Sequence, residues 1–175
     1  DDKTEIIADE FEYDKVKNEL LLKGNILIEN SNDKTLIRSD EIKYFKTLGK
    51  IITYGDTQIN IDNNYIIDTK DAVILKKEGT LSSSKNTTIK DKYQNNFKTE
   101  EFMFFVEDEV LKAKNVELVD NQGNISKLNN FFGDLKNEEF YGKDLKLKFN
   151  QSMFNNPENE PRLYGNKISS DKNFS

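Results

Sequence analysis

Apolar and polar residues alternate with a period of two along most of the chain. Phe11 and Tyr13 fall on one face of an extended segment, and Glu10, Glu12 and Asp14 fall on the other. Clusters of turn-forming residues separate the alternating segments, at 14–18, 30–34, 47–50, 62–64, 76–79 and 120–124. No stretch shows a helical period long enough for a helix. The pattern therefore predicts an all-β protein of about eleven or twelve short antiparallel strands.

A two-residue motif returns every 29 to 31 residues. Its copies are Gly24-Asn25, Gly55-Asp56, Lys85-Asn86, Lys114-Asn115 and Lys143-Asp144. A fixed period of this length is typical of stacked repeats, each of which buries its apolar face against its neighbours. We expect about five repeats of roughly 30 residues over 1–150. Pro157 and Pro161 mark 151–175 as a cap or linker after the last repeat.

The apolar phase slips at three corresponding positions, after Ile37, Ile67 and Phe97, which lie two residues before Ser39, Thr69 and Thr99. Ile37 precedes Ser39 by two residues, whereas Ile42 follows it by three. A regular strand would point these two isoleucines to opposite faces. A bulge or corner at the Ser/Thr-Asp/Glu position would turn both inward and would bend one layer into two facing layers, as in a β-solenoid or jelly roll.

The inward apolar residues form a stripe that is either an ordinary core or the lining of a groove for lipid acyl chains. The predicted lining consists of Phe11, Tyr13, Ile26, Ile28, Ile37, Ile42, Tyr44, Ile59, Ile67, Ile74, Ile89, Phe97, Phe102, Phe104, Val116, Leu118, Leu145 and Leu147. Tyrosines 13, 44, 54 and 65 could place hydroxyl groups at the mouth of such a groove, or could be ordinary cross-strand aromatics.

Composition narrows the possible functions. The 175 residues carry a net charge of −6 without a visible basic patch, so nucleic acid is not an expected partner. Histidine and cysteine are absent, which removes the usual nucleophile–base pairs and zinc sites. Acidic pairs such as Asp40-Glu41 lack the glycine-rich context of calcium-binding repeats. We therefore expect no catalytic residues, no metal and no cofactor.

Two segments resemble a known family. Residues 7–14 followed by 22–28 are similar to the "ITAD…YD…GNV.I" pattern of the OstA-like domains of lipopolysaccharide (LPS) transport, and 37–44 with Gly55-Asp56 repeat it. These domains occur in the periplasmic bridge protein and at the N-terminus of the outer-membrane LPS-assembly protein. The segment from Phe154 to Asn166 resembles the part of the assembly protein that leads toward its membrane barrel, which this sequence does not contain.

The resemblance implies a β-jellyroll open along one side, in the periplasm of a Gram-negative bacterium, as part of an outer-membrane protein. Acyl chains of LPS would travel in the groove without any chemical reaction. The implied partners are LPS, a periplasmic bridge jellyroll, and the protein's own C-terminal barrel with its lipoprotein plug. We expect the bridge protein to dock on the N-terminal edge, at Ile6, Ile7, Ala8, Phe11 and Tyr13.

Two other functions remain open from the sequence. A structural or adhesive β-solenoid would have a dry, filled interior, whereas a lipid conduit would have an apolar cleft. A polysaccharide-acting enzyme on a β-helix would need carboxylates clustered with Arg or Lys, and the only two arginines, Arg38 and Arg162, lie far apart in sequence.

Overall fold

The computed structural model describes residues 3–32, 34–150 and 161–170. Its strands are β1 (Thr4–Ile7), β2 (Glu10–Asp14), β3 (Glu19–Asn30), β4 (Thr35–Phe45), β5 (Lys50–Ile61), β6 (Tyr65–Lys70), β7 (Val73–Leu75), β8 (Thr80–Ser83), β9 (Thr87–Lys90), β10 (Asn96–Thr99), β11 (Glu101–Phe105), β12 (Val110–Val119), β13 (Ile125–Asp134), β14 (Glu139–Lys148) and β15 (Arg162–Ser170). Every pairing between them is antiparallel. The predicted all-β antiparallel class is confirmed.

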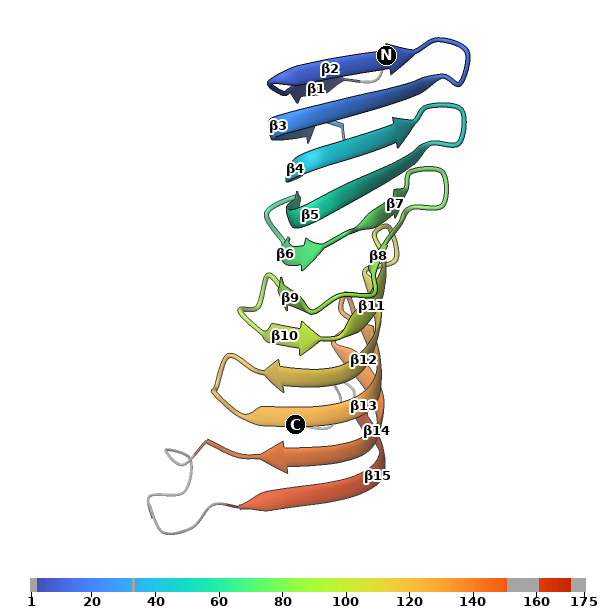
Figure 1. Ribbon diagram of the computed structural model, residues 1–175. Helices are drawn as coiled ribbons and strands as arrows, with labels where there is room; N and C mark the ends of the chain where they lie inside the picture. The colour runs from blue at the N-terminus through green and yellow to red at the C-terminus, as the bar shows by residue number, and fades with distance from the viewer. Residues whose placement is uncertain (1–2, 33, 151–160, 171–175) are drawn as a thin grey trace.

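Within the described residues, the fifteen strands make eleven passes, each hydrogen-bonded to the next (Figure 1). Four passes are split into two strands, β1–β2, β6–β7, β8–β9 and β10–β11, because the chain bends sharply in the middle. The other long strands bend at the same level but keep their pairing. The strand count therefore exceeds the expected eleven or twelve, while the number of passes agrees with it.

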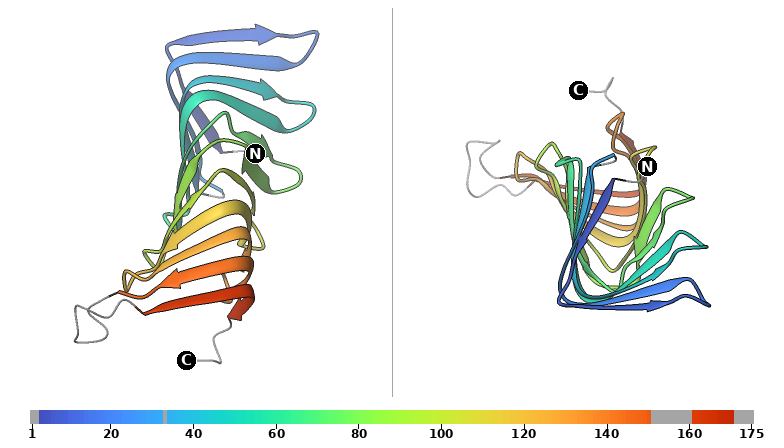
Figure 2. Two further views of the ribbon diagram at one scale, coloured as in Figure 1. Left: turned by 60° about the horizontal axis from the view of Figure 1, so that its bottom comes forward. Right: turned by 90° about the horizontal axis from the view of Figure 1, so that it is seen from above.

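The bends align into one corner line, which folds the sheet into two facing layers (Figure 2). The first face contains β1, β6, β9 and β10, and the second face contains β2, β7, β8 and β11. The longer strands contribute one half to each face. The predicted bulge is confirmed at Ser39, where the β4–β5 register shifts before Glu41.

The recurring pairs of the sequence lie on this corner line. Gly24, Asn25 and Gly55 have φ values of 71°, 45° and 78°, and Asn115 and Asp144 have values of 52° and 55°. Glycine adopts this left-handed region freely, and Asn and Asp tolerate it better than other residues. Asn or Asp thus supplies the left-handed corner residue in the two last pairs, where the glycine is lost.

The inner side of the corner carries a line of buried hydroxyl groups. Thr69 and Thr87 place their Oγ1 atoms 2.6 Å apart, and Thr57 donates to Oγ1 of Thr53 at 2.7 Å. Thr99 donates to the backbone oxygen of Lys114 at 2.6 Å. These side chains satisfy polar backbone groups that the bend removes from the regular ladder, and each would be costly to bury alone.

Candidate functional site

The interior between the two faces contains two apolar ladders that run across the stack from the β1–β2 pass to β12. On the first face, strand pairing connects Ile6, Ile28, Ile37, Ile59, Ile67, Ile89, Phe97 and Leu118 in order. On the second face it connects Tyr13, Leu20, Tyr44, Ile51, Ile74, Leu81, Phe104 and Leu111. Directly opposed residues of an antiparallel pair project to the same side of the sheet, so each ladder is one continuous apolar row.

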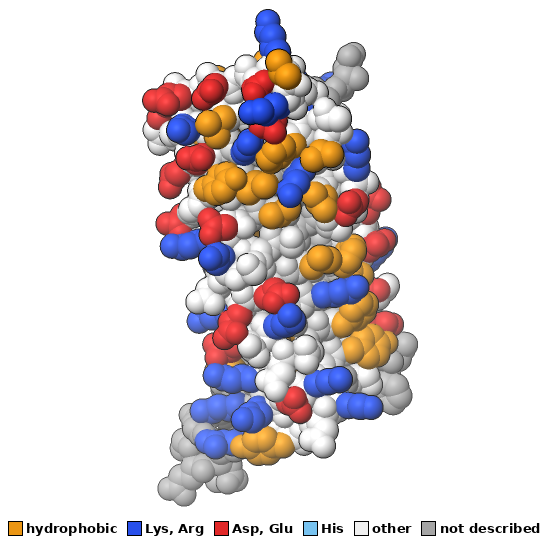
Figure 3. Space-filling view, turned by 45° about the vertical axis from the view of Figure 1, so that its right-hand side comes forward, with side chains coloured by type: hydrophobic (Ala, Val, Ile, Leu, Met, Phe, Trp, Pro, Cys, Tyr) orange, Lys and Arg blue, Asp and Glu red, His pale blue; other side chains and the backbone are white. Residues whose placement is uncertain are grey.

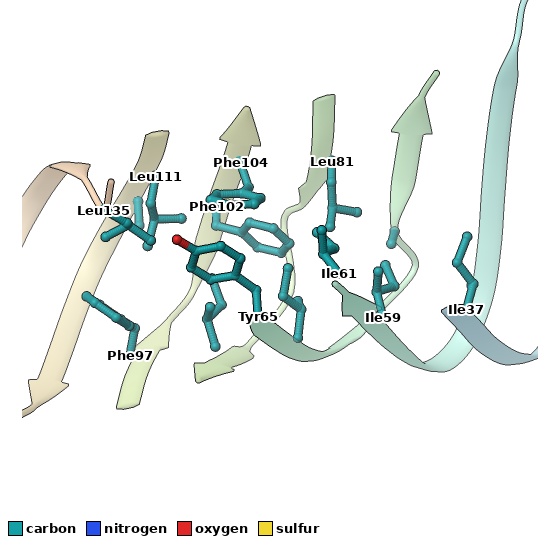
Figure 4. Packing of buried hydrophobic residues seen from close by; sticks show 14 of the residues in the cluster. Ile37, Ile59, Ile61, Tyr65, Leu81, Phe97, Phe102, Phe104, Leu111 and Leu135 are labelled. Atoms are coloured by element: carbon teal, nitrogen blue, oxygen red, sulfur yellow. The ribbon is translucent and has the colours of Figure 1, made fainter. Parts of the chain in front are cut away.

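Sixteen of the eighteen predicted lining residues are part of the buried core or pack against it. Ile67 and Phe97 are completely buried, and both residues that flank the phase slip, Ile37 and Ile42, are buried as well. The two faces touch through aromatic contacts such as that between Tyr65 and Phe104, whose ring centroids are 5.0 Å apart (Figure 4). In this conformation the middle of the interior is packed and closed to solvent.

Phe11 and Tyr13, the other two predicted lining residues, are 57 % and 46 % exposed. They lie opposite Leu22 and Leu20 and therefore share the inner side of the second face. Their exposure has a simple cause, because the pass formed by β1 and β2 pairs with β3 alone among the described strands. The first end of the stack thus presents inward-directed aromatic rings to the surroundings.

The residues predicted to dock a partner lie on this same terminal pass. Ile6 pairs with Ile28 and packs against the core, while Ile7 points outward and is 54 % exposed. A terminal strand of this kind offers backbone groups to another strand. Docking itself stays a prediction.

The opposite end of the stack is built in the same way. β15 pairs with β14 alone among the described strands, and Leu163, opposite Leu147, is 50 % exposed. Both ends of the apolar interior are therefore uncapped by any described residue. The segment 151–160, predicted to be part of the cap or linker, lies outside the described residues.

The two faces are tied together at their rims, the rows of turns farthest from the corner. Tyr65 and Lys92 belong to the first rim, and Glu109 belongs to the second. The Tyr65 hydroxyl donates to Oε2 of Glu109 at 2.5 Å, and the Lys92 ammonium contacts the same oxygen at 3.0 Å. We call these three residues the rim clasp.

The surroundings of the rim clasp shift the pKa of each member. Burial, followed by the hydrogen bond to Glu109, raises the pKa of Tyr65 far above its ordinary value. Burial alone would raise the pKa of Glu109, but the hydrogen bonds from Tyr65 and Lys92 outweigh this effect and lower it. The hydrogen bond with Glu109 raises the pKa of Lys92. The clasp is therefore a phenol and an ammonium bound to one carboxylate at neutral pH.

Sequence reasoning did not find this clasp. It placed the Tyr65 hydroxyl at the mouth of the groove as one option, but it gave no partner, because Glu109 is 44 residues away. Tyr54, another of the four tyrosines, lies on the outer side of the second face and is 41 % exposed. The alternation of residues could have assigned Tyr54 to the outside.

The described residues show no group of three or more Asp or Glu side chains arranged to hold a metal ion. Several corner carboxylates instead accept hydrogen bonds from corner amides. Asn25 Nδ2 donates to Asp9 at 2.8 Å, and Asn115 Nδ2 donates to Glu100 at 2.6 Å. Within the described part of the chain, no helix has the length and apolar character that crossing a membrane requires.

Comparison with known proteins shows similarity at the level of the fold. No protein-family model and no curated protein matches the sequence. Among solved structures, the chain is similar to LptH from Pseudomonas aeruginosa, described as the LptA-homologous periplasmic component of the conserved lipopolysaccharide transport device. The TM-score is 0.55 at 10 % sequence identity, over 65 % of this chain and 82 % of LptH.

This chain has the fold of LptH. At 10 % identity the similarity concerns the fold, and it agrees with the β-jellyroll that the sequence resemblance implied. It does not distinguish between the periplasmic bridge protein and the N-terminal domain of the assembly protein.

Proposed function

We propose that this chain is a periplasmic LPS-transport domain that shields the acyl chains of lipid A between its two faces. The observation that carries the proposal is the apolar interior, in which two ladders face each other from the β1–β2 end to β12 and the buried Leu128, Phe131 and Leu145 continue the core toward the β15 end. The shared fold with a periplasmic component of an LPS transport device supports it. The proposed function involves no catalysed reaction and no cofactor.

The energetics suit such a role. Each CH₂ group of an acyl chain gains about 0.8 kcal/mol when it leaves water, so several acyl chains together favour an apolar path strongly. A row made largely of Ile, Leu and Phe offers similar sites in series, which permits movement along the stack. Because the middle of the interior is packed, lipid entry requires the two faces to separate at their rims, with the corner as the hinge.

We further propose that the two terminal passes dock on other jellyrolls by strand pairing. The β1–β2 edge, with Ile6, Ile7 and Ala8, would receive the periplasmic bridge protein, and Phe11 and Tyr13 would continue the apolar interior into it. The test places a photoreactive residue at Ile7 in Gram-negative cells. A cross-link to the bridge protein is expected there and not at Gln58, on the outer side of the first face. Equal labelling from both positions contradicts docking at this edge.

Within LPS transport, we assign the chain to the N-terminal domain of the outer-membrane LPS-assembly protein (LptD) rather than to the bridge protein. The assignment rests on the resemblance of the segment from Phe154 to Asn166 to the part that leads toward the barrel. The domain would then act at the outer membrane with its own C-terminal barrel and lipoprotein plug. The sequence of the natural chain beyond Ser175 tests this directly, since a bridge protein has no barrel strands there.

The lipid path is tested by photo-crosslinking in LPS-producing cells. Phe11 and Phe102 are inward positions at the end and in the middle of the stack, and Glu12 and Lys98 are outward positions beside inward neighbours. LPS adducts are expected from Phe11 and Phe102 and not from the two controls. Adducts at the outward positions without adducts at the inward ones would show that lipid does not use the interior. Circular dichroism of each purified variant checks that the fold is retained.

The packed interior also favours a second candidate, a structural or adhesive β-solenoid with a dry core. In that case the ladders only stabilise the stack, and neither Phe11 nor Phe102 labels lipid. A disulfide introduced across the rims separates the two functions. The chain has no cysteine of its own, so a single engineered pair is unambiguous. Locked rims block transport by a conduit and leave a scaffold unaffected.

A further inference from the structure

The outer side of the second face carries apolar side chains where a solvent-facing row is normally polar. Strand pairing aligns Val73, Ser82, Met103, Lys112, Phe132 and Tyr141 in one outward row. Met103, Phe132 and Tyr141 are 42 %, 38 % and 47 % exposed. Figure 3 shows hydrophobic side chains gathered in patches on this side of the molecule, with lysines between them.

This row forms one wall of a cavity of about 840 Å³ on the outer surface of β7, β8 and β11 to β15. The volume lies within the range of ordinary small-molecule sites, roughly 300–1,000 Å³. Met103 and Phe132 point to the outer side, because they alternate with the buried Phe102 and Phe131 along their strands. Phe102 and Phe131 also contribute to the lining of the cavity.

A second outward row lies two residues closer to the corner on each strand, and it is rich in charged residues. Lys114, Lys143 and Lys167 belong to this second row, whereas a fourth lysine of the cavity, Lys112, belongs to the apolar row. Two carboxylates also line the cavity, Asp71 and Glu101, and both already have cationic partners, Lys85 at 3.6 Å and Lys114 at 2.9 Å.

Three of these lysines have no carboxylate partner among the residues that the structure describes. Lys143 and Lys167 are directly opposed on β14 and β15, and both are exposed. The Lys112 ammonium lies 4.8 Å from the ring centroid of Phe105 and 5.9 Å from that of Phe132. The cavity thus has a local excess of positive charge in a protein whose net charge is −6.

We propose that this outer cavity binds an amphipathic anion, with its apolar part along Met103, Phe132 and Tyr141 and its head group on Lys112, Lys143 and Lys167. The two rows are one step of two residues apart, about 7 Å along the strand, which suits an alkyl chain or aromatic ring that carries a carboxylate or phosphate. An anion of this kind supplies the counter-charge that the three lysines lack, and its apolar part covers the exposed row. This site lies on the outer side of the second face, whereas the proposed lipid path lies between the two faces.

The experiment uses the purified chain and the fluorescent anion anilinonaphthalene sulfonate. Saturable binding is expected, and it should weaken with ionic strength because exposed charges are screened. The combined variant Lys112→Gln, Lys143→Gln and Lys167→Gln should bind roughly tenfold more weakly, since each exposed ion pair contributes up to about 1 kcal/mol. The variant Phe132→Ser should weaken binding by a similar factor.

The matched control removes three exposed lysines elsewhere on the outer surface, in the variant Lys23→Gln, Lys90→Gln and Lys98→Gln. None of these lines the cavity. The control variant should bind as the unchanged protein does. Equal weakening in both triple variants, or no saturable binding by the unchanged protein, overturns the proposal.

Competition identifies the head group. Dodecanoate and dodecyl phosphate should displace the probe, and the more effective of the two distinguishes a carboxylate from a phosphate ligand. Uncharged dodecyl maltoside should be at least tenfold weaker, and equal displacement by it contradicts a role for the lysines. Dimerisation that Phe132→Ser abolishes, without probe binding, would assign the row to a second copy of the chain and overturn the proposal.

Discussion

The phenolic oxygen of Tyr65 lies 2.5 Å from Oε2 of Glu109, and this hydrogen bond joins the two rims of the folded sheet. Lys92 contacts the same carboxylate oxygen from the first rim at 3.0 Å. Tyr65 itself is buried, and its ring lies against Phe104 of the second face. The rim clasp therefore combines a polar bond with an apolar contact at the side of the stack opposite the corner.

Removal of the Tyr65 hydroxyl group tests how strongly the rim clasp holds the rims together. Tyr65→Phe keeps the ring contact and deletes the donor to Glu109, and we expect a loss of about 1.5–3 kcal/mol in the free energy of unfolding, the range for a bond to a charged group. Urea denaturation measures it. The control is Tyr13→Phe, whose hydroxyl bonds to exposed Asn18 and whose loss should stay below about 0.5 kcal/mol. Equal losses of unfolding free energy in the two variants would show that the hydrogen bond between the rims does not stabilise the fold more than an exposed one.

The rim clasp should also contribute to the pH dependence of stability. The pKa of Glu109 is lower in the folded state than its ordinary value, because hydrogen bonds from Tyr65 and Lys92 outweigh burial. Its contribution is therefore fully present above the ordinary pKa of a glutamate and is lost as the pH falls through the lowered folded value. Glu109→Gln should flatten the fall in unfolding free energy between neutral and acidic pH. A Glu109→Gln profile identical to that of the unchanged protein would contradict this role.

The left-handed backbone conformation of Gly55 at the corner predicts that a substitution there lowers the stability of the fold. Its φ of 78° is unfavourable for a residue with a side chain, although the nearest atom to an added Cβ, on Asp40, is 4.0 Å away. Gly55→Ala should therefore cost about 1–2 kcal/mol through conformation alone, as measured by thermal or urea unfolding. Gly165→Ala is the matched control, because Gly165 lies in a strand without a positive φ and its new Cβ would make only ordinary contacts. A Gly55 variant as stable as this control would show that the bend tolerates other conformations.

The hydrogen bond between the buried hydroxyl groups of Thr69 and Thr87 should contribute measurably to the stability of the fold. Thr69→Val keeps the shape of the side chain and removes the 2.6 Å contact with Thr87, which retains its bond to the backbone oxygen of Lys85. We expect a loss of about 1 kcal/mol in unfolding free energy. Thr88→Val, next to Thr87 but on the outer side of β9, should change stability by less than about 0.5 kcal/mol. If Thr69→Val is neutral, the hydroxyl line does not stabilise the corner.

Much of the fold follows from local patterns that the sequence displays directly. Alternation assigned Ile37, Ile67 and Phe97 to one side of their strands, and the phase slip after each of them predicted the bend that brings Ile42, Ala72 and Phe102 to the same interior. Local patterns suffice here because side-chain direction in a strand depends on position parity, and a bulge changes that parity within one or two residues. The later recurring pairs lack glycine. Asn115 and Asp144 keep the left-handed corner in these pairs.

The sequence by itself determined the class of fold and the side on which apolar residues such as Ile37 and Phe97 lie, because these depend on residues near one another in the chain. Tertiary structure alone decided that the interior is packed shut in its middle and open at its ends. It also brought Tyr65 and Lys92 to Glu109, and it placed Met103, Phe132 and three lysines around one outer cavity. These arrangements depend on how far the two faces rotate and how closely their rims approach. That approach is the sum of many small twists between neighbouring strands, which no short segment of sequence contains.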